Sequence, residues 1–526
     1  MTMISHQWKL CVLYACIILL QVSFTACTAM KGMEREERKY NAQVTLYLNG
    51  PAKTNSDVTF VISAINIVSE DGTTIGITDD LRSVGSRDVE GRQVLLGEKI
   101  VPEGKYKGIQ VMLKEAAVTR EGKTVPLTLP EDRITIDIDV NLRRSQNVTL
   151  FFTWNPDASV MEGNRFSPLL TVKSQVPELS SLLIYVTNEE SDNVSVINRQ
   201  TGEIAATVMV EKRPRGIAAS RGGERLKVYV ANSGSNSISV IDPTRNRVEN
   251  TIPIRFGREP GSVAVASVSP DRELLFVANY GSNTVSVVDT TSYQELEKID
   301  VGRGPIAVAV DPPVDDLTGT RFLSFTDINL LKSYREKFIN VYVVNNTSND
   351  ISVLRIDKSS GRSSEVITLP VEWRPVAVTV DYPRGKVYIA NYDSDKLSVI
   401  DIVQTVKGNS DGAVSTINNV GFSITDVAAD PTFDRLYLLK EVPGEVVIIK
   451  PFSSGSNSLR AVMPPVLGTI PVGNAPRSIV SDPEDRKLYV VNRGSDTISV
   501  IDKTTKREEE VIPVGKNPYG IAVFPD

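Results

Sequence analysis

The sequence predicts an all-β protein built largely from a repeated unit of strands. A stretch of 14 residues, YVANSGSNSISVID at 229–242, recurs as FVANYGSNTVSVVD at 276–289 and as YVVNRGSDTISVID at 489–502. Each copy places β-branched and aromatic residues on both sides of a polar turn, which is the pattern of a β-hairpin. Because no helical period accompanies the copies, strands are expected to dominate the fold.

Seven copies of the hairpin can be aligned, and the sixth is degenerate. They begin at Tyr185, Tyr229, Phe276, Tyr342, Tyr388, Tyr437 and Tyr489. An apolar strand precedes each hairpin, as at 263–266, and another follows it, as at 252–254. Spacings of about 44 to 66 residues are typical of repeat arrays. Four strands per copy, with small residues in the first strand, predict a β-propeller whose first strands line the centre.

The phase of the repeat predicts how the ring closes. The array begins with a second strand, Leu182–Val186, and ends with a first strand, Gly520–Phe524. We expect the last strand to complete the first blade, because this pairing hides the sheet edges. Each blade buries its faces only against its neighbours, so the repeat is scaffold and function is expected in the residues that depart from it.

The repeat also carries a family resemblance. YVTN stands at 185–188, and the surrounding unit, VYVAN with GSN and SVID and later IPVG and IAV, resembles the YVTN-type propeller repeat. The resemblance covers residues 182–526 and implies a seven-bladed propeller.

Residues 41–175 contain no copy of the repeat. Strand signals recur at 42–48, 58–64, 108–113, 134–140 and 148–154. Short strands separated by Gly-containing turns predict a β-sandwich. The order AINIVSEDG, VPEGKYKGIQVML and LLTVK resembles the DUF4382-type domain of bacterial lipoproteins, which implies no particular activity. The predicted fold class is therefore all-β, with an N-terminal β-sandwich followed by a seven-bladed β-propeller of four-stranded blades.

Residues 1–26 predict a secretory signal peptide. Lys9 precedes an apolar run, Leu10–Phe24, which is short for a membrane span and typical of a signal h-region. The run ends in Phe-Thr-Ala-Cys27, which resembles a bacterial lipobox and implies lipidation of Cys27. Residues 27–40 are predicted to be a charged tether. We therefore expect a membrane-anchored cell-envelope lipoprotein, in the periplasm or on the cell surface. An uncleaved N-terminal anchor is the alternative.

The composition excludes several kinds of site. The single His6 and the three Cys, at 11, 16 and 27, all lie at or before position 27. The predicted mature chain therefore lacks Ser-His-Asp and Cys-His nucleophile systems and metal or haem sites built on His or Cys. We expect no cofactor, no metal and no catalytic residue. A net charge of −6 gives no sign of a nucleic-acid partner.

Basic and aromatic residues gather in the loops that enter the first strand of each blade. They are Arg213, Arg215, Arg258, Arg303, Trp373, Arg374, Arg477 and Tyr519. Each lies within two residues of a Pro, and such loops meet on one face of a propeller around its channel. We predict that they form a binding face for an envelope protein or an anionic ligand. The alternative is that these turns are only a structural part of the repeat. Nearby acids, Glu189 and Asp393 among them, would then weaken the electrostatic field of the basic residues.

Three other segments were candidates for special roles. The insertion Pro313–Asn340 has partly helical spacing, and it could cap the propeller, contact a partner or be a packed excursion. Asn391–Asp395 alternates oxygen ligands but lacks the Gly and distal Glu of an EF-hand, so a solvated β-turn is expected. Lys506–Glu510 is expected to be a solvated charged loop.

The predicted function is a non-enzymatic binding scaffold that uses the propeller face. The alternative is an extracytoplasmic hydrolase or lactonase-like enzyme that uses carboxylates or a metal, because YVTN-like propellers include lactonases of sugar acids. Acids that converge in a deep channel would favour the enzyme, whereas variable loops around the face would favour the binding protein.

Overall fold

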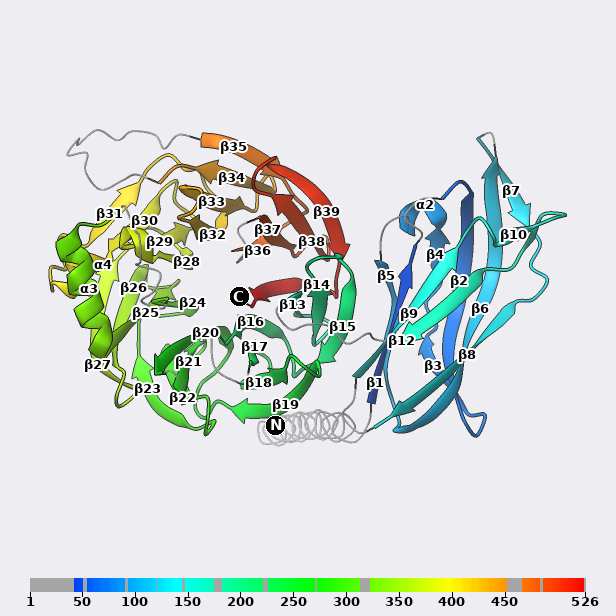
Figure 1. Ribbon diagram of the computed structural model, residues 1–526, viewed down its shortest axis with the longest axis horizontal. Coiled ribbons are helices and arrows are strands. Elements are labelled where there is room, and N and C mark those ends of the chain that lie inside the picture. Colours follow the sequence, from blue (N-terminus) through cyan, green and yellow to red (C-terminus); the bar gives the residue numbers. More distant parts are fainter. Residues whose placement is uncertain are drawn as a thin grey trace, which may run out of the picture. The chain divides into compact units, whose positions relative to one another are not determined.

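Figure 1 shows the computed structural model, which describes residues 42–50, 54–89, 93–120, 122–143, 147–174, 182–220, 226–269, 272–312, 322–451, 466–482 and 486–524. The chain divides into two compact units, Met1–Gly91 with Leu96–Ser174 and Arg92–Leu95 with Gln175–Asp526. Each unit is described by itself. Strands dominate both, so the all-β prediction is confirmed.

The N-terminal unit contains two main sheets. One is built from β1 (Ala42–Asn49), β5 (Gln93–Val101), β9 (Asn147–Asn155) and β12 (Leu169–Ser174), in the order β12-β9-β1-β5. The other is built from β2 (Asp57–Ser69), β3 (Thr74–Thr78), β4 (Arg82–Gly85), β6 (Gly104–Arg120), β7 (Lys123–Leu127) and β8 (Arg133–Leu142). A short helix, α2 (Ser86–Val89), and a small hairpin, β10 (Val160–Met161) with β11 (Arg165–Phe166), complete the unit.

The buried faces of these two sheets pack together as a β-sandwich. The ring of Phe60 on β2 meets the ring of Trp154 on β9, with centroids 4.9 Å apart in an edge-to-face arrangement. Trp154 is 1% exposed, and its indole N–H donates to Ser159 Oγ at 3.0 Å. A large aromatic side chain with its polar atom satisfied is a stable centre for such a core.

The second unit is a ring of seven four-stranded sheets, the blades (Figure 1). Blade 1 contains β13 (Leu183–Asn188), β14 (Asn193–Asn198), β15 (Ile204–Met209) and β40 (Pro518–Val523). Blade 2 contains β16 (Pro214–Ala219), β17 (Val228–Asn232), β18 (Ser237–Asp242) and β19 (Arg247–Pro253). Blade 3 contains β20 (Pro260–Ser269), β21 (Arg272–Asn279), β22 (Thr284–Asp289) and β23 (Glu295–Asp300). Blade 4 contains β24 (Pro305–Val310), β25 (Phe338–Asn345), β26 (Asp350–Asp357) and β27 (Arg362–Pro370).

The remaining three blades continue the ring in chain order. Blade 5 contains β28 (Pro375–Asp381), β29 (Lys386–Asn391), β30 (Leu397–Asp401) and β31 (Val414–Ile417), with the short helices η3 (Tyr382–Arg384) and α4 (Ile402–Val406). Blade 6 contains β32 (Ile424–Asp430), β33 (Arg435–Lys440), β34 (Glu445–Ile449) and β35 (Val466–Pro471). Blade 7 contains β36 (Pro476–Ser481), β37 (Lys487–Asn492), β38 (Thr497–Asp502) and β39 (Arg507–Pro513).

The last strand closes the ring, as the phase of the repeat predicts. β40 pairs antiparallel with β13, with Val523 opposite Ile184 and Ile521 opposite Val186. β40 also contacts β36 of blade 7 and β16 of blade 2, so blade 1 lies between them. The first strands lie innermost in the ring and the fourth strands lie outermost (Figure 1). The innermost strands therefore place their entry loops at the channel.

A buried hydrogen bond explains why the sequence repeats so closely. The Asn that ends the second strand is fully buried in six blades, and its Nδ2 donates to the Ser Oγ seven residues later at 2.8–3.1 Å. The six pairs are Asn188–Ser195, Asn232–Ser239, Asn279–Ser286, Asn345–Ser352, Asn391–Ser398 and Asn492–Ser499. Blade 6 has Lys440 and Val447 at these positions, which accounts for its degenerate sequence.

Residues 313–321 of the insertion in blade 4 lie outside the described residues, and the described remainder contains a helix that packs on the ring. In α3 (Phe325–Lys337), Leu331 and Arg335 are buried, and Arg335 Nη1 lies 3.4 Å from Asp311 Oδ2. The helix lies at the outer edge of the ring and not at its centre (Figure 1). These contacts favour the packed excursion among the three alternatives for this segment.

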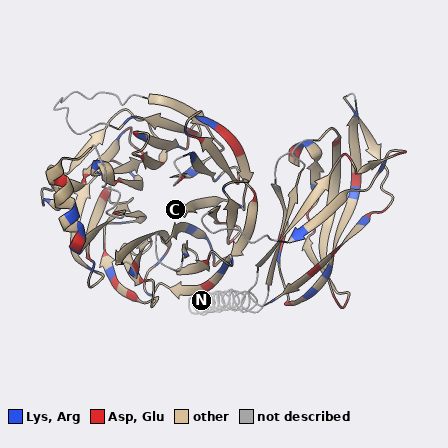
Figure 2. Ribbon diagram, in the orientation of Figure 1, with Lys and Arg blue, Asp and Glu red and all other residues tan. Residues whose placement is uncertain are grey.

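The expectation of a loop at Lys506–Glu510 is wrong. Residues from Arg507 onward form β39, the outermost strand of blade 7, and Arg507, Glu508 and Glu509 are exposed. An outermost strand can carry such a charged run because one of its faces meets solvent. Charges of both signs occur on the outer strands and on α3 (Figure 2).

Candidate functional site

Three positions in the blade loops supply the residues at the mouth of the channel, although not every blade contributes all three. The first strand of most blades begins with Pro, and we call the residues before and after it the pre-Pro and post-Pro positions. The residue after the second-strand Asn, or its equivalent, is the post-Asn position. Pre-Pro residues have positive φ, including Arg213 (53°), Glu259 (52°), Arg374 (52°) and Ala475 (43°). This left-handed turn directs the loop into the innermost strand.

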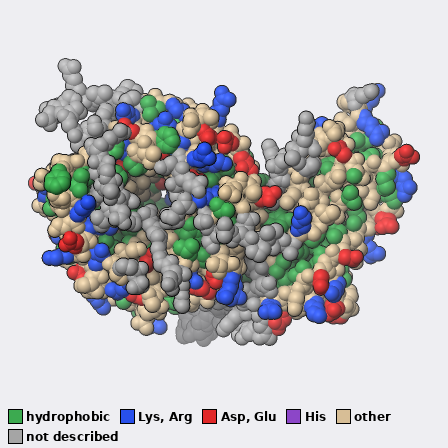
Figure 3. Space-filling model, in the orientation of Figure 1, with side chains coloured by type: hydrophobic (Ala, Val, Ile, Leu, Met, Phe, Trp, Pro, Cys, Tyr) green, Lys and Arg blue, Asp and Glu red, His purple; other side chains and the backbone are tan. Residues whose placement is uncertain are grey.

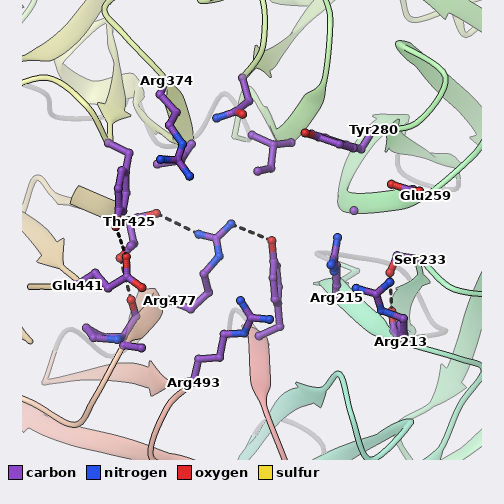
Figure 4. Close-up of a pocket in the computed structure, with 18 residues that line it drawn as sticks. Arg213, Arg215, Ser233, Glu259, Tyr280, Arg374, Thr425, Glu441, Arg477 and Arg493 are labelled. Atoms are coloured by element: carbon purple, nitrogen blue, oxygen red, sulfur yellow. Dashed lines mark hydrogen bonds between the residues drawn. The ribbon is translucent and has the colours of Figure 1, made fainter. Parts of the chain in front are cut away.

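These positions enclose a cavity of about 600 Å³ at one end of the channel (Figure 4). Its charged lining consists of five arginines and two glutamates: Arg213, Arg215, Arg374, Arg477, Arg493, Glu259 and Glu441. The described lining thus has an excess of positive charge, although the whole chain has a net charge of −6. Acidic and basic side chains are mixed over the face of the molecule that Figure 3 shows.

Glu189 holds three of the arginines together. Its side chain is 3% exposed, and Oε1 lies 2.8 Å from Nη2 of both Arg213 and Arg215, while Oε2 lies 3.0 Å from Nη2 of Arg493. Burial acts to raise the pKa of Glu189, but the charges and hydrogen bonds of these arginines outweigh it, so the pKa lies below its ordinary value. One carboxylate therefore neutralises a part of the positive charge and leaves the rest.

Tyr519 is surrounded by three guanidinium groups, two of which also bind Glu189. Arg477, Arg215 and Arg493 lie over its ring at 4.7, 5.4 and 5.7 Å from the centroid. Arg477 donates from Nη2 to the Tyr519 hydroxyl at 2.9 Å and from Nη1 to the Thr425 carbonyl at 3.1 Å. Burial acts to raise the pKa of Tyr519, yet Arg477 and Arg215 bring it below its ordinary value. The region around this phenol is therefore strongly positive.

The far side of the cavity carries a weaker, partly neutralised charge. The Arg374 guanidinium lies 4.6 Å from the centroid of the Tyr392 ring and 3.5 Å from Asp393 Oδ2. The Tyr392 hydroxyl donates to Glu441 Oε2. Because Arg374 and Asp393 are both about half exposed, their ion pair is screened by solvent and contributes little to stability.

The structure brings together five of the eight predicted face residues. Arg213, Arg215, Arg374, Arg477 and Tyr519 line the cavity, whereas Arg258, Arg303 and Trp373 do not. The three that do not line it all lie two residues before Pro, which we call the rim position. Rim residues are exposed in every blade: Lys212, Arg258, Arg303, Trp373, Phe422, Asn474 and Lys516. The distance of each residue from the Pro in its loop therefore distinguishes the residues that line the cavity from those on the rim.

Arg493 is the cavity arginine that the sequence alone did not indicate. It occupies the post-Asn position, where the other cavity-lining residues are Ser233, Tyr280, Asn346, Tyr392 and Glu441. The sequence does contain a signal for this position, because the post-Asn residue varies among hairpin copies that are otherwise alike. The predicted weakening by nearby acids is partly confirmed. Asp192 Oδ2 binds Lys212 Nζ at 2.7 Å, and Glu189 and Asp393 bind arginines.

A second space of about 160 Å³ adjoins the cavity along the innermost strands and shares Ile306, Val376, Arg477 and Tyr519 with it. Asp426 lies there, and its Oδ2 accepts hydrogen bonds from Ser478 Oγ and from the Ile479 N–H, both at 2.9 Å. Burial is the main cause that raises the pKa of Asp426. In the described residues, no three or more His, Cys, Asp or Glu side chains come together in a way that could hold a metal ion.

Cys27, the predicted lipidation site, and the signal segment 1–26 lie outside the described residues. No helix in the described part of the chain combines the length and apolar character required to cross a membrane.

The fold and the cavity define the class of protein as a seven-bladed β-propeller with a cationic channel mouth. The chain is 24% identical over 329 residues to the seven-bladed beta-propeller protein Rv1057 of Mycobacterium tuberculosis, covering 59% of this chain and 76% of the relative. No protein-family model matches the chain.

Solved structures share the fold at low sequence identity. A functionally unknown protein from Desulfotomaculum acetoxidans has a TM-score of 0.50 and 12% identity, with 66% of this chain and 100% of that chain covered. A proposed 6-phosphogluconolactonase from Bacteroides uniformis has a TM-score of 0.48 and 16% identity, with 65% and 99% covered. These likenesses concern the fold alone.

Proposed function

We infer that this protein is a binding protein of the cell envelope that takes up an anionic ligand at the cationic mouth of its propeller. The observation that carries the proposal is the gathering of Arg215, Arg477 and Arg493 around Tyr519, in a cavity that is concave and open to solvent. Ligand sites of small molecules commonly have volumes of about 300–1,000 Å³. The cavity falls within that range.

Arg477 is the strongest single contributor to this proposal. Its hydrogen bonds go to a hydroxyl and a backbone carbonyl, and in the described part of the chain no carboxylate lies within salt-bridge distance of it. A guanidinium without a carboxylate partner in a partly buried site favours an incoming oxyanion, because charge-assisted bonds to it are stronger than neutral ones.

The location of the protein is part of the proposal. The signal peptide at 1–26, the lipobox-like sequence before Cys27 and the charged tether at 27–40 support export and lipid anchoring. Mass spectrometry of the mature N-terminus tests this expectation. A mature chain that starts anywhere other than at a lipidated Cys27 would refute it.

A hydrolase is the second candidate, because two carboxylates share the cavity with the arginines. Glu441 is held by the Tyr392 hydroxyl, and Glu259 comes from the loop of blade 3. Carboxylates can act as general bases in such a site. If this candidate is correct, the protein hydrolyses lactones of sugar acids and Glu441→Gln or Glu259→Gln abolishes turnover. Ligand binding without turnover supports the binding protein.

The binding proposal is tested by calorimetry at low ionic strength with citrate and 2-naphthoate as anionic probes. We expect Arg215→Gln with Arg477→Gln to weaken binding at least tenfold. Arg258→Gln with Arg303→Gln is the matched control, since it removes the same charge from the equivalent loops of blades 3 and 4, at rim positions. Equal weakening by both pairs, or binding of neither probe to the unmodified protein, would show that the cavity is not an anion site.

A further inference from the structure

The cavity has two chemically different sides. The cations around Tyr519 of blade 1 come from blades 7 and 2, the two neighbours of blade 1 in the ring. Blades 3, 4 and 5 supply Tyr280, Ile306, Val376 and Tyr392 to the opposite side. In Figure 4, Arg477, Arg493 and Arg215 lie near one another, and Tyr280 lies across the cavity from Arg493. The side that faces the arginine cluster is therefore mainly aromatic and aliphatic, with Glu259 and Arg374 at its pre-Pro positions.

This division follows from the post-Pro and post-Asn positions. The post-Pro residue is Arg in blades 2 and 7 and Tyr in blade 1, but it is Gly261, Ile306 and Val376 in blades 3, 4 and 5. The aromatic post-Asn residues Tyr280 and Tyr392 flank the two aliphatic ones in chain order. Neighbouring blades place equivalent residues side by side, so each side of the cavity is continuous.

Two features limit the size and chemistry of the occupant. The space that adjoins the cavity, about 160 Å³, is well below the range of ordinary ligand sites, so the ligand is held in the mouth. Small inorganic anions would contact the arginines and leave the opposite side in water. An organic anion can satisfy the guanidinium groups with one end and cover Tyr280, Ile306 and Val376 with the other.

We propose that the ligand is an amphiphilic organic anion, with one carboxylate or phosphate group bound by Arg215, Arg477 and Arg493 and a planar or aliphatic body packed against Tyr280, Ile306 and Val376. The proposal rests on the binding function above. The two headgroups share the oxyanion chemistry that guanidinium groups recognise, and the experiment separates them.

The test compares 2-naphthoate, 2-naphthyl phosphate, acetate and neutral 2-naphthalenemethanol by calorimetry. We expect 2-naphthoate or 2-naphthyl phosphate to bind at least tenfold more tightly than acetate, and the neutral alcohol not to bind measurably. The tighter of the two anions identifies the headgroup. Equal affinities for acetate and 2-naphthoate would overturn the amphiphilic ligand but leave the anion site in place. If none of the anions binds, the proposed binding function itself is refuted.

Variants on the two sides give different results if the inference is correct. Tyr280→Ala should weaken the binding of 2-naphthoate at least fivefold and leave the affinity for acetate unchanged. Arg477→Gln should weaken the binding of both anions. Tyr293→Ala is the control, since Tyr293 comes from the same blade and does not line the cavity. Thermal unfolding of each variant confirms that it is folded. If Tyr280→Ala weakens acetate as much as 2-naphthoate, the aromatic side has no role in recognition.

Discussion

Six blades share one buried hydrogen bond, whereas the positions that face the channel differ from blade to blade. The Asn–Ser pair recurs with almost the same distance in every blade except blade 6. One residue beyond that Asn, or beyond Lys440 in blade 6, the chain places Glu189, Ser233, Tyr280, Asn346, Tyr392, Glu441 and Arg493. The contrast teaches that adjacent residues in one loop serve two purposes, one for the fold and one for the cavity.

The largest effect is expected from removing the strand that closes the ring. Deleting residues 518–526 exposes the edge of β13 and removes the contacts of β40 with β36 and β16. We expect loss of cooperative thermal unfolding, or aggregation, because an unpaired strand edge is a template for association.

A chain that ends at Phe524 is the control for this truncation, because it keeps β40 and the contact of Phe524 with Tyr185, whose ring centroids are 5.9 Å apart. It should unfold like the full chain. Unchanged cooperative unfolding of the longer truncation would show that the ring does not depend on this closure.

Asn279 and Tyr280 provide the sharpest test of the comparison, since they are neighbours in the chain. Asn279→Ala should reduce the free energy of unfolding by about 1–3 kcal/mol, because it removes a buried hydrogen bond to Ser286. Tyr280→Ala should change stability much less, since Tyr280 lies at the cavity surface, and its effect should appear in binding. Denaturant unfolding measures both. An equal loss of unfolding free energy in the two variants would contradict the separation between a residue that stabilises the fold and a residue that serves the cavity.

A smaller effect, dependent on pH, is expected at Glu189. Glu189→Gln should cost about 1–2 kcal/mol of unfolding free energy near neutral pH, below the usual value for a fully buried pair because the arginines are partly exposed. The pKa of Glu189 is lower in the folded state than its ordinary value of 4.5, so its contribution is present above that value and is lost as pH falls through the folded pKa. The stability difference between the two proteins should shrink in that acidic range. A difference that stays constant with pH would contradict this account.

Much of the fold could be predicted because the repeat is a local pattern. The hairpins, the phase of the array and the closing strand follow from period, turn residues and strand order, as the pairing of Val523 with Ile184 shows. The segment from Arg507 to Glu510 was misassigned because its charges indicated a loop. Its place as an outermost strand depends on pairing with β38, which composition does not reveal.

The candidate site could be predicted only in part. Loop chemistry pointed to Arg215, Arg374 and Arg477, but it did not separate side chains that line the cavity from those on the rim, such as Arg303. That separation depends on the positive φ of the pre-Pro residue, which reverses the direction of the chain. The division of the cavity into a cationic side and an aromatic side depends on which blades are neighbours, and therefore on ring closure.

The central claim, that the arginine cluster around Tyr519 is the ligand site, is tested most directly at the phenol itself. NMR of protein labelled with ¹³C at tyrosine Cζ, with Tyr519→Phe to assign the signal, gives the pKa of Tyr519. We predict a pKa below the ordinary value of 10.0 in the free protein, because Arg477 and Arg215 favour the phenolate. Saturating 2-naphthoate should raise it, since the bound anion opposes the field of the guanidinium groups. A pKa of Tyr519 that does not change when the ligand binds would place the ligand elsewhere and contradict the account.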